Sequence, residues 1–429
     1  MENIPILKNP TFCAAMWDGL YIGPDQKVWP CCMYKRNDDI TDNSIINNTI
    51  SSAINSEHLI ELRKLTFEGV PIAGCDKCYN DEKNFGNSAR LTVNCKLKGE
   101  KLHKIKQLAK NGFVIDGLKP SIIMPIFSNI CNQKCRSCNP QLSSKISLEF
   151  YNIEKANNQS KIIDFTKKFG SSKHFRKTPI DNPNALNELI NNGLFDECEI
   201  IRYAGGEPFI TEDFYRMIDY LVDSGKSKRI EIEVSTNGSY LNFSKYNALE
   251  YLEKIATNFK SFNIQVSIDS SDPDRLAYIR AGAKLDVIES FLSVAFALAN
   301  QFSSTTLTIT YLVTLFNIFD MRKDLEILTT KYEGSMFCVY PAYTPYYLNA
   351  SLFSLEDYGL NKDADSKVSF LIDHIFDFIT LRFKGHDLAA ITTFKEITTE
   401  LDLVRGESYQ VLFPKLRDLV DKTLSEGHK

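Results

Sequence analysis

Long apolar runs are missing from this sequence of 429 residues, and no stretch reaches the length needed to span a bilayer. Its first residues, MENIPILKNPTFCAAMW, lack the basic segment and apolar run of a secretory signal peptide. The formal net charge is only -4, which provides no general field for binding nucleic acid. We therefore expect a soluble, cytoplasmic protein with no membrane or nucleic-acid partner.

Histidine is also scarce: the 6 histidines include no HxH or HxxxH pair, so no histidine-based metal site is indicated. Cysteine is plentiful, with 11 residues, and an odd number cannot all pair as disulfides. In a chain without an export signal, cysteines are more often thiolates than disulfides. The composition, 43% hydrophobic and 24% charged, is that of a globular protein, and the length predicts two or three domains.

One short segment, SNICNQKCRSCNP at 128–140, contains Cys131, Cys135 and Cys138 in a CxxxCxxC pattern. It follows the apolar run SIIMPIFS, which places the cysteines on a loop after a buried strand. Three thiolates on one loop can hold a [4Fe–4S] cluster by three corners and leave the fourth iron open. A zinc site with a distant fourth ligand fits the three cysteines equally well. In the cluster interpretation, Lys134 and Arg136 would lie close to its negative charge.

The chain from about residue 120 to 345 alternates strand and helix patterns, which indicates parallel βαβ units. Polar or Gly-rich groups follow successive strands, namely GGEP at 205–208, then STNGS, then SIDS. Parallel sheets and barrels carry their sites at this edge. Beyond residue 345 the pattern is mainly helical.

This order and spacing resembles the radical S-adenosylmethionine (radical SAM) enzymes. The resemblance implies an α/β fold: a partial (β/α)6 TIM-like barrel, a small N-terminal cysteine-rich cluster domain and a helical C-terminal extension. The domains expected on this basis are 1–112, 113–345 and 346–429. One departure is Ser137, since the position before the third cysteine is often aromatic in that superfamily.

The resemblance also implies the chemistry. The open iron would chelate the amino and carboxylate groups of SAM, and an electron would cleave SAM into methionine and a 5′-deoxyadenosyl radical. Cys131, Cys135 and Cys138 would be the catalytic ligands. The expected SAM contacts are Gly205, Gly206, Glu207, Ser235, Asn237, Ser267 and Arg280, with Thr236 and Asp269 on the same rim. For Arg280 a surface ion pair is the alternative.

The N-terminal region contains a second group of cysteines: Cys13, Cys31, Cys32, Cys75 and Cys78. A CxxC with further cysteines upstream is first of all typical of a zinc site. The layout also resembles the SPASM/twitch module, in which a small hairpin, here LYIGPDQKVWPCC, ends in Pro-Cys-Cys. This resemblance implies a second [4Fe–4S] cluster, with either Cys31 or Cys32 as a ligand. The module usually follows the barrel, whereas here it precedes it, and Gln26 stands where the family usually has glycine.

The remaining cysteines, Cys95, Cys198 and Cys338, are interpreted as core or incidental residues. The aromatic segment at 341–353 could line a substrate pocket or form a structural strap. We expect a radical SAM enzyme that abstracts a hydrogen atom from a peptide, sugar or other small-molecule substrate, using two [4Fe–4S] clusters and SAM. An electron donor such as flavodoxin or ferredoxin is the expected partner. The alternatives are a maturase of a ribosomally made precursor peptide and a non-catalytic zinc-binding scaffold.

Overall fold

A computed structural model describes residues 9–36, 39–46, 48–97, 99–117, 119–157, 159–168, 175–181, 184–362 and 367–427. Its main feature is a sheet of strand order β12-β11-β9-β6-β5-β3-β1-β2. Six neighbouring strands of this sheet are parallel and follow each other in chain order: β3 (Ile122–Pro125), β5 (Ile200–Tyr203), β6 (Glu231–Thr236), β9 (Ser261–Ser267), β11 (Thr305–Val313) and β12 (Met336–Pro341). The predicted partial (β/α)6 barrel is therefore confirmed.

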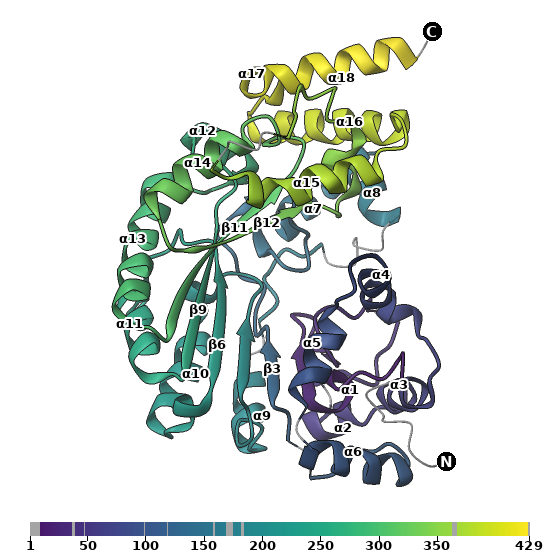
Figure 1. The fold of residues 1–429 in the computed structure, drawn as a ribbon, viewed down its shortest axis with the longest axis vertical. Coiled ribbons are helices and arrows are strands. Elements are labelled where there is room, and N and C mark those ends of the chain that lie inside the picture. Colours follow the sequence, from purple (N-terminus) through teal and green to yellow (C-terminus); the bar gives the residue numbers. More distant parts are fainter. Residues whose placement is uncertain are drawn as a thin grey trace.

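Helices cover the outer face of these strands (Figure 1). They are α9 (Ala185–Asn191), α10 (Glu212–Asp223), α11 (Ala248–Asn258), α13 (Leu285–Gln301) and α14 (Met321–Lys331). In β9, the apolar residues Phe262, Ile264 and Val266 are buried and alternate with the half-buried polar residues Asn263, Gln265 and Ser267. Because successive side chains of a strand point to opposite faces, the face of β9 away from its buried apolar residues is polar.

The N-terminal hairpin extends this sheet. β1 (Gly19–Ile22) pairs antiparallel with β2 (Val28–Trp29) and parallel with β3 of the barrel. At the hairpin turn, Gln26 has φ 61, the left-handed conformation that glycine usually supplies. Gln26 therefore adopts at this turn a conformation that is uncommon for residues other than glycine.

Short helices complete the N-terminal region: α1 (Ala15–Asp18), α2 (Ile50–Ile54), α3 (Glu57–Glu68), α4 (Asp76–Phe85), α5 (Ala89–Lys96) and α6 (Gly99–Lys110). Residues at both ends of α3 cap the helix. Ser56 accepts a hydrogen bond from the Leu59 backbone N–H, and Gly69 ends the helix with φ 89.

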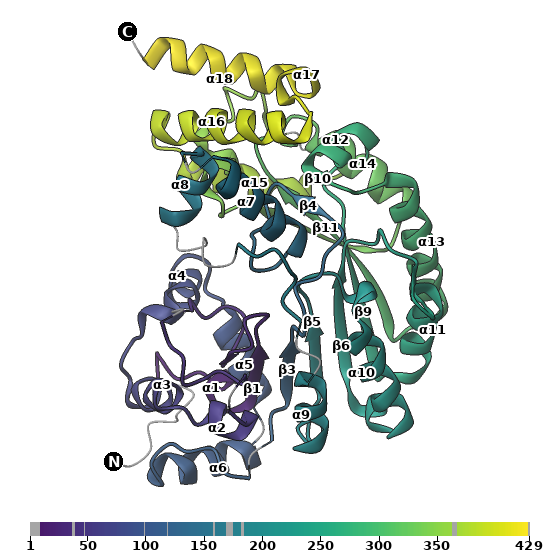
Figure 2. The ribbon, with the colours of Figure 1, turned by 180° about the vertical axis from the view of Figure 1, so that it is seen from behind.

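The C-terminal helices are α15 (Ser369–Arg382), α16 (Leu388–Arg405), α17 (Tyr409–Leu412) and α18 (Pro414–Gly427). They lie beside α7 (Ser144–Ala156), α8 (Lys161–Lys168) and α12 (Pro273–Ile279), as both views show (Figures 1 and 2). This is the end of the barrel at which the cysteine loop leaves β3. The divisions at residues 112 and 345 stay predictions. Among the described residues, no helix is both long and apolar enough to cross a bilayer.

Candidate functional site

The cysteine loop between β3 and α7 is held by its backbone from three sides. Its central residues form β4 (Lys134–Cys135), which pairs antiparallel with β10 (Arg280–Ala281). Next to this pair, the Arg136 N–H donates to the Ile279 carbonyl at 2.9 Å. At the start of the loop, the Cys131 N–H donates to Ser144 Oγ at 3.2 Å, at the beginning of α7. The positions of the thiols are therefore set by the strands and helices around them.

Burial disfavours the charged form of all three thiols of this loop. It raises the pKa of Cys138 to about 12, and it also raises the pKa values of Cys131 and Cys135. A bound iron would reverse this effect, because a metal cation stabilises the thiolates that coordinate it.

The Gly205-Gly206 turn after β5 packs directly on the cysteine loop. Gly206 has φ 57, and a Cβ on it would lie 2.6 Å from the Ile130 carbonyl oxygen. The next residue, Glu207, donates its backbone N–H to that same carbonyl at 2.7 Å. Glycine is thus required here for close backbone approach as well as for the left-handed conformation.

The Glu207 side chain is buried, with 2% of its surface exposed, and joins the end of β5 to the end of β6. Its carboxylate accepts hydrogen bonds from Thr236 Oγ1 at 2.6 Å and from the Asn237 N–H at 2.8 Å. Burial raises the pKa of Glu207 to about 7, while these donors act in the opposite direction.

Asn237 lies beside the first cysteine. Its Nδ2 is 3.9 Å from Cys131 Sγ and donates to Asn132 Oδ1 at 2.8 Å. Farther along this rim, Ser235 Oγ donates to Gln265 Oε1, and Ser267 Oγ accepts from Thr310 Oγ1. The polar residues predicted at the ends of β6 and β9 therefore form hydrogen-bonded pairs across neighbouring strands.

Arg280 forms an ion pair, but a buried one beside a thiol. Its Nε donates to Asp269 Oδ2 at 2.7 Å, and its side chain is only 12% exposed. Its Nη1 lies 3.9 Å from Cys135 Sγ. Burial lowers the pKa of Arg280, but the charges of Asp269 and Cys135 outweigh that effect and hold it above its usual value.

Lys134 and Arg136, whose place next to a cluster stays a prediction, contact carboxylates. Lys134 Nζ pairs with Glu149 on α7, and Arg136 Nη2 lies 2.6 Å from both Asp402 on α16 and Glu407. Sequence reasoning missed this link to the C-terminal helices. Arg136 and Asp402 are 266 positions apart, and no local pattern signals such a pair.

Five cysteines of the N-terminal region line one cavity of about 40 Å³: Cys13, Cys31, Cys32, Cys75 and Cys78. Burial, assisted by the charges of neighbouring cysteines, raises the pKa values of Cys13, Cys31 and Cys75 to about 12. Burial also raises the pKa of Cys32, but Cys32 is exposed, and the charges that act on it are those of Arg202, Arg36 and Glu233. Cys32 therefore differs from the other four cysteines in its charged surroundings.

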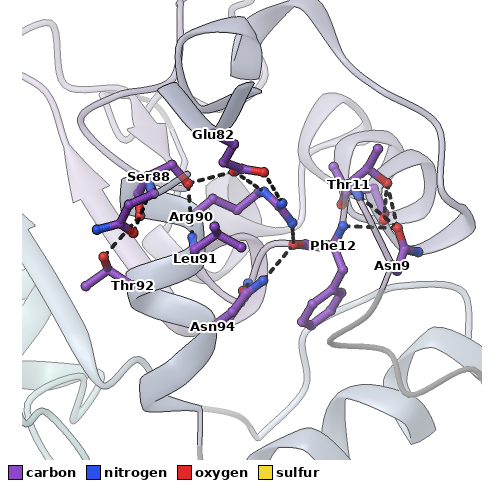
Figure 3. Close-up of polar contacts among 12 residues, drawn as sticks. Asn9, Thr11, Phe12, Glu82, Ser88, Arg90, Leu91, Thr92 and Asn94 are labelled. Atoms are coloured by element: carbon purple, nitrogen blue, oxygen red, sulfur yellow. Dashed lines mark hydrogen bonds and ion pairs between the residues drawn. The ribbon is translucent and has the colours of Figure 1, made fainter. Parts of the chain in front are cut away.

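Arg90 and Asn94 on α5 hold the segment around Cys13 (Figure 3). The Phe12 carbonyl accepts from Arg90 Nη1 at 2.7 Å and from Asn94 Nδ2 at 2.9 Å, and the Ala14 N–H donates to Asn94 Oδ1. Arg90 also pairs with Glu82 on α4, the helix that carries Cys78. This network fixes the Cys13 segment against the CxxC helix.

The two groups of cysteines supply thiol sulfurs, the donors that iron–sulfur clusters use. All eight of these cysteines are free thiols rather than disulfides: Cys13, Cys31, Cys32, Cys75, Cys78, Cys131, Cys135 and Cys138. Within the described part of the chain, no three metal-binding side chains converge closely enough to hold a single ion. Of the remaining cysteines, Cys198 is buried, Cys338 is half-buried and Cys95 is exposed.

Comparison with known proteins identifies two regions. Residues 125–317 match the family model of the radical SAM superfamily, and residues 13–79 match that of the SPASM iron–sulfur cluster-binding domain. A search of curated proteins found no match.

Solved structures that match this chain include anSMEcpe with bound S-adenosylmethionine, at 14% identity and TM-score 0.35, covering 60% of this chain and 59% of that chain. Another is Streptococcus suis SuiB bound to S-adenosylmethionine, at 16% identity and TM-score 0.38, covering 75% and 64%. A third is SuiB bound to its precursor peptide SuiA, at 14% identity and TM-score 0.39, covering 80% and 66%. The chain spans about three-fifths of the length of the anSMEcpe chains it matches.

Fold and site together define an α/β partial-barrel protein with two cysteine-rich centres. Residues 125–317 are identified as a radical SAM domain and residues 13–79 as a SPASM domain that precedes it, in the order predicted from the sequence. Its cofactors are accordingly [4Fe–4S] clusters and S-adenosylmethionine.

Proposed function

We propose that this protein is an enzyme that cleaves SAM reductively and abstracts a hydrogen atom from a peptide, sugar or other small-molecule substrate. The observation that carries the proposal is the attachment of the CxxxCxxC loop to the GGEP turn, through the hydrogen bond from the Glu207 N–H to the Ile130 carbonyl at 2.7 Å. This contact joins the proposed cluster ligands to the proposed SAM-binding turn in one rigid unit.

Cys131, Cys135 and Cys138 would hold the catalytic cluster. When bound, the cluster and SAM together supply a 5′-deoxyadenosyl radical, and the protein's task is to orient them and exclude water. Asn237 and Arg280 support this assignment, because their nitrogens lie 3.9 Å from Cys131 Sγ and Cys135 Sγ. Such donors compensate the negative charge on the sulfurs.

The proposed SAM contacts are Gly205, Gly206, Glu207, Ser235, Asn237, Ser267 and Arg280. Glu207 would act mainly by positioning Thr236 and Asn237, because its carboxylate accepts hydrogen bonds from both residues. Ser235 and Ser267 retain hydrogen-bonding capacity beyond their present partners, since a hydroxyl combines one donor with two acceptor positions.

A second cluster would be held by Cys13, Cys31, Cys75 and Cys78. Cys31 is preferred over Cys32, because Cys31 is affected by the charge of Cys13 whereas Cys32 is exposed. Fixing Cys13 to α4 through Arg90 keeps two of these ligands together. The electron donor would be a small redox protein such as flavodoxin or ferredoxin, and the cytoplasmic location stays a prediction.

Metal analysis distinguishes this proposed enzyme from a non-catalytic zinc-binding scaffold. Protein purified without oxygen and reconstituted with iron and sulfide should contain about eight irons, as two [4Fe–4S] clusters require. Changing Cys131, Cys135 and Cys138 together to Ala should leave about four. Stoichiometric zinc in the wild type, or iron that does not change in the triple variant, would contradict the proposal.

A further inference from the structure

The barrel contributes part of the wall of the cavity that the five N-terminal cysteines line. Besides these cysteines, the lining residues include Ile122 and Met124 of β3 and Arg202 of β5. β3 and β5 are neighbours in the sheet, and they lie between the N-terminal helices and the later strands of the barrel (Figure 2). A charged side chain of the barrel therefore reaches the cysteine cavity.

Strand alternation explains why Arg202 faces this cavity. β3 and β5 are parallel, with Ile122 opposite Ile200. Met124 and Arg202 each follow two positions later in their strands, so they share the face of Ile122. Arg202 is half-buried, whereas Ile201 before it is buried on the other face of the sheet. The Arg202 side chain thus lies on the inner face of the barrel, on the side of the cysteines.

Two of the described residues that line the cavity are arginines, and they differ in how far their charges are neutralised. The Arg90 guanidinium donates hydrogen bonds to both carboxylate oxygens of Glu82 and to the Phe12 carbonyl. Arg202 makes only a loose ion pair among the described residues, with its Nε 4.0 Å from Glu233 Oε1, and these side chains are 37% and 33% exposed. The charge of Arg202 is therefore the less compensated of the two.

Glu233 belongs to a row of polar side chains across the inner face of the sheet. It lies opposite Arg202 in the pairing of β5 with β6, and opposite Asn263 in the pairing of β6 with β9. Asn263 Nδ2 donates to Glu233 Oε2 at 3.5 Å, and Thr308 Oγ1 on β11 donates to Asn263 Oδ1 at 2.8 Å. This row keeps a carboxylate next to Arg202 at the edge of the cavity.

The charge of Arg202 acts on the cysteines as well. Burial raises the pKa of the Cys32 thiol, and the charge of Arg202 is the largest of the effects that oppose this rise. The reduction potential of an iron–sulfur cluster depends on its net charge and on the groups around its sulfurs. A nearby cation favours the reduced cluster, because reduction adds a negative charge.

We propose that Arg202 is the residue through which the barrel raises the reduction potential of the N-terminal cluster, with Glu233 as its counter-charge. This inference rests on the proposed function, because it requires the second cluster. Three positions after Arg202, the same chain segment reaches Gly205 of the proposed SAM-binding turn. One strand, β5, would therefore contribute to both centres.

Redox titration followed by electron paramagnetic resonance tests this inference. It is carried out on the full protein with both clusters and on the variant in which Cys131, Cys135 and Cys138 are Ala, where the N-terminal cluster is the only one expected. In both, Arg202→Gln should lower the ratio of reduced to oxidised N-terminal cluster about tenfold at a given potential, a shift of about 59 mV for a one-electron couple. Arg202→Lys should restore most of the shift, because it keeps the charge.

A second substitution should act with the opposite sign. Glu233→Gln removes the negative charge beside Arg202, so the ratio of reduced to oxidised cluster should rise about threefold. A purely structural role of these residues would not reverse the sign. Arg216→Gln is the matched control, because Arg216 lies on α10, is 40% exposed and does not line the cavity. Its potential should equal that of the parent protein.

Iron content measured in parallel separates the inference from the proposed function. An unchanged potential in Arg202→Gln, or shifts of the same sign in Arg202→Gln and Glu233→Gln, at full iron content would overturn the inference and leave the proposed function intact. Loss of the N-terminal cluster from both Arg202→Gln and Arg202→Lys would also overturn it, since Arg202 would then serve assembly of the site. If the triple cysteine variant contains no iron, the second cluster of the proposed function is wrong, and the inference fails with it.

Discussion

Arg280 lies directly opposite Cys135 in the short antiparallel pairing of β10 with β4, and its Nη1 is 3.9 Å from the Cys135 sulfur. The same side chain forms an ion pair with Asp269, whose side chain is 1% exposed. A buried cation is thus held at a fixed position beside a proposed cluster ligand.

Removing this cation should make the catalytic cluster harder to reduce. In Arg280→Gln we expect the reduction potential to fall by roughly 60 mV, a tenfold change for a one-electron couple, because a positive charge near the sulfurs stabilises the reduced state. Redox titration followed by electron paramagnetic resonance measures this shift. Arg280→Lys should restore part of it, and Arg280→Gln with Asp269→Asn controls for an unpaired Asp269. A potential equal to that of the wild type in both Gln variants would show that Arg280 does not tune the cluster.

Protein variants that lack one or the other of the two adjacent cysteines of the hairpin, Cys31 and Cys32, should differ in iron content. Cys31→Ala should lose about half of the iron, because Cys31 is half-buried in the cysteine-lined cavity and is affected by the charge of Cys13, whereas the exposed Cys32 should be dispensable. Iron and sulfide assays of the matched variants measure the difference. The reverse result, iron loss only in Cys32→Ala, would reassign the ligand.

The N-terminal centre should be separable from the catalytic one. Changing Cys75 and Cys78 together to Ala should remove about half of the iron and leave SAM cleavage without substrate intact, while turnover of the true substrate fails. Because β1 pairs with β3, loss of the module could also disturb the barrel, so circular dichroism and gel filtration are needed as controls. A folded double variant with full iron content would exclude these two cysteines as ligands.

Glu207 should make the stability of the protein without cofactors depend on pH. Its folded-state pKa is raised to about 7 by burial, so the native state binds a proton more tightly than the unfolded state. The free energy of unfolding should therefore fall as pH rises from 5 to 8, by up to about 3 kcal/mol. Glu207→Gln should remove this contribution. Urea titrations of both proteins at several pH values measure it, and parallel pH profiles would contradict the assignment.

Much of the fold could be predicted from the sequence because its signals are local. Alternating strand and helix patterns and the Cys spacing each depend on a few neighbouring residues. Sequence patterns do not locate the sixth strand, β12, or the helix α16 individually. β12 is a short run of residues, and α16 is interrupted by threonines, which are weak helix formers.

Long-range pairing could not be predicted from local patterns. Nothing in the hairpin sequence indicates that β1 joins the barrel sheet next to β3, about a hundred positions later. The place of Arg136 between two cysteines predicts that it lies close to a cluster, which stays a prediction, but it does not indicate the ion pair with Asp402 on α16. A basic residue pairs with whichever carboxylate the fold brings near it, and that depends on tertiary structure.

The central claim is that the loop of Cys131, Cys135 and Cys138 supports reductive cleavage of SAM. Its most direct test is the formation of 5′-deoxyadenosine by anaerobically reconstituted protein with a strong reductant and no substrate, compared between the wild type and Cys135→Ala. We predict slow, steady formation by the wild type and none by Cys135→Ala, since the variant lacks one of the three thiolates that anchor the cluster. Equal formation by both proteins, or no formation by a wild type that contains its full iron, would contradict the account.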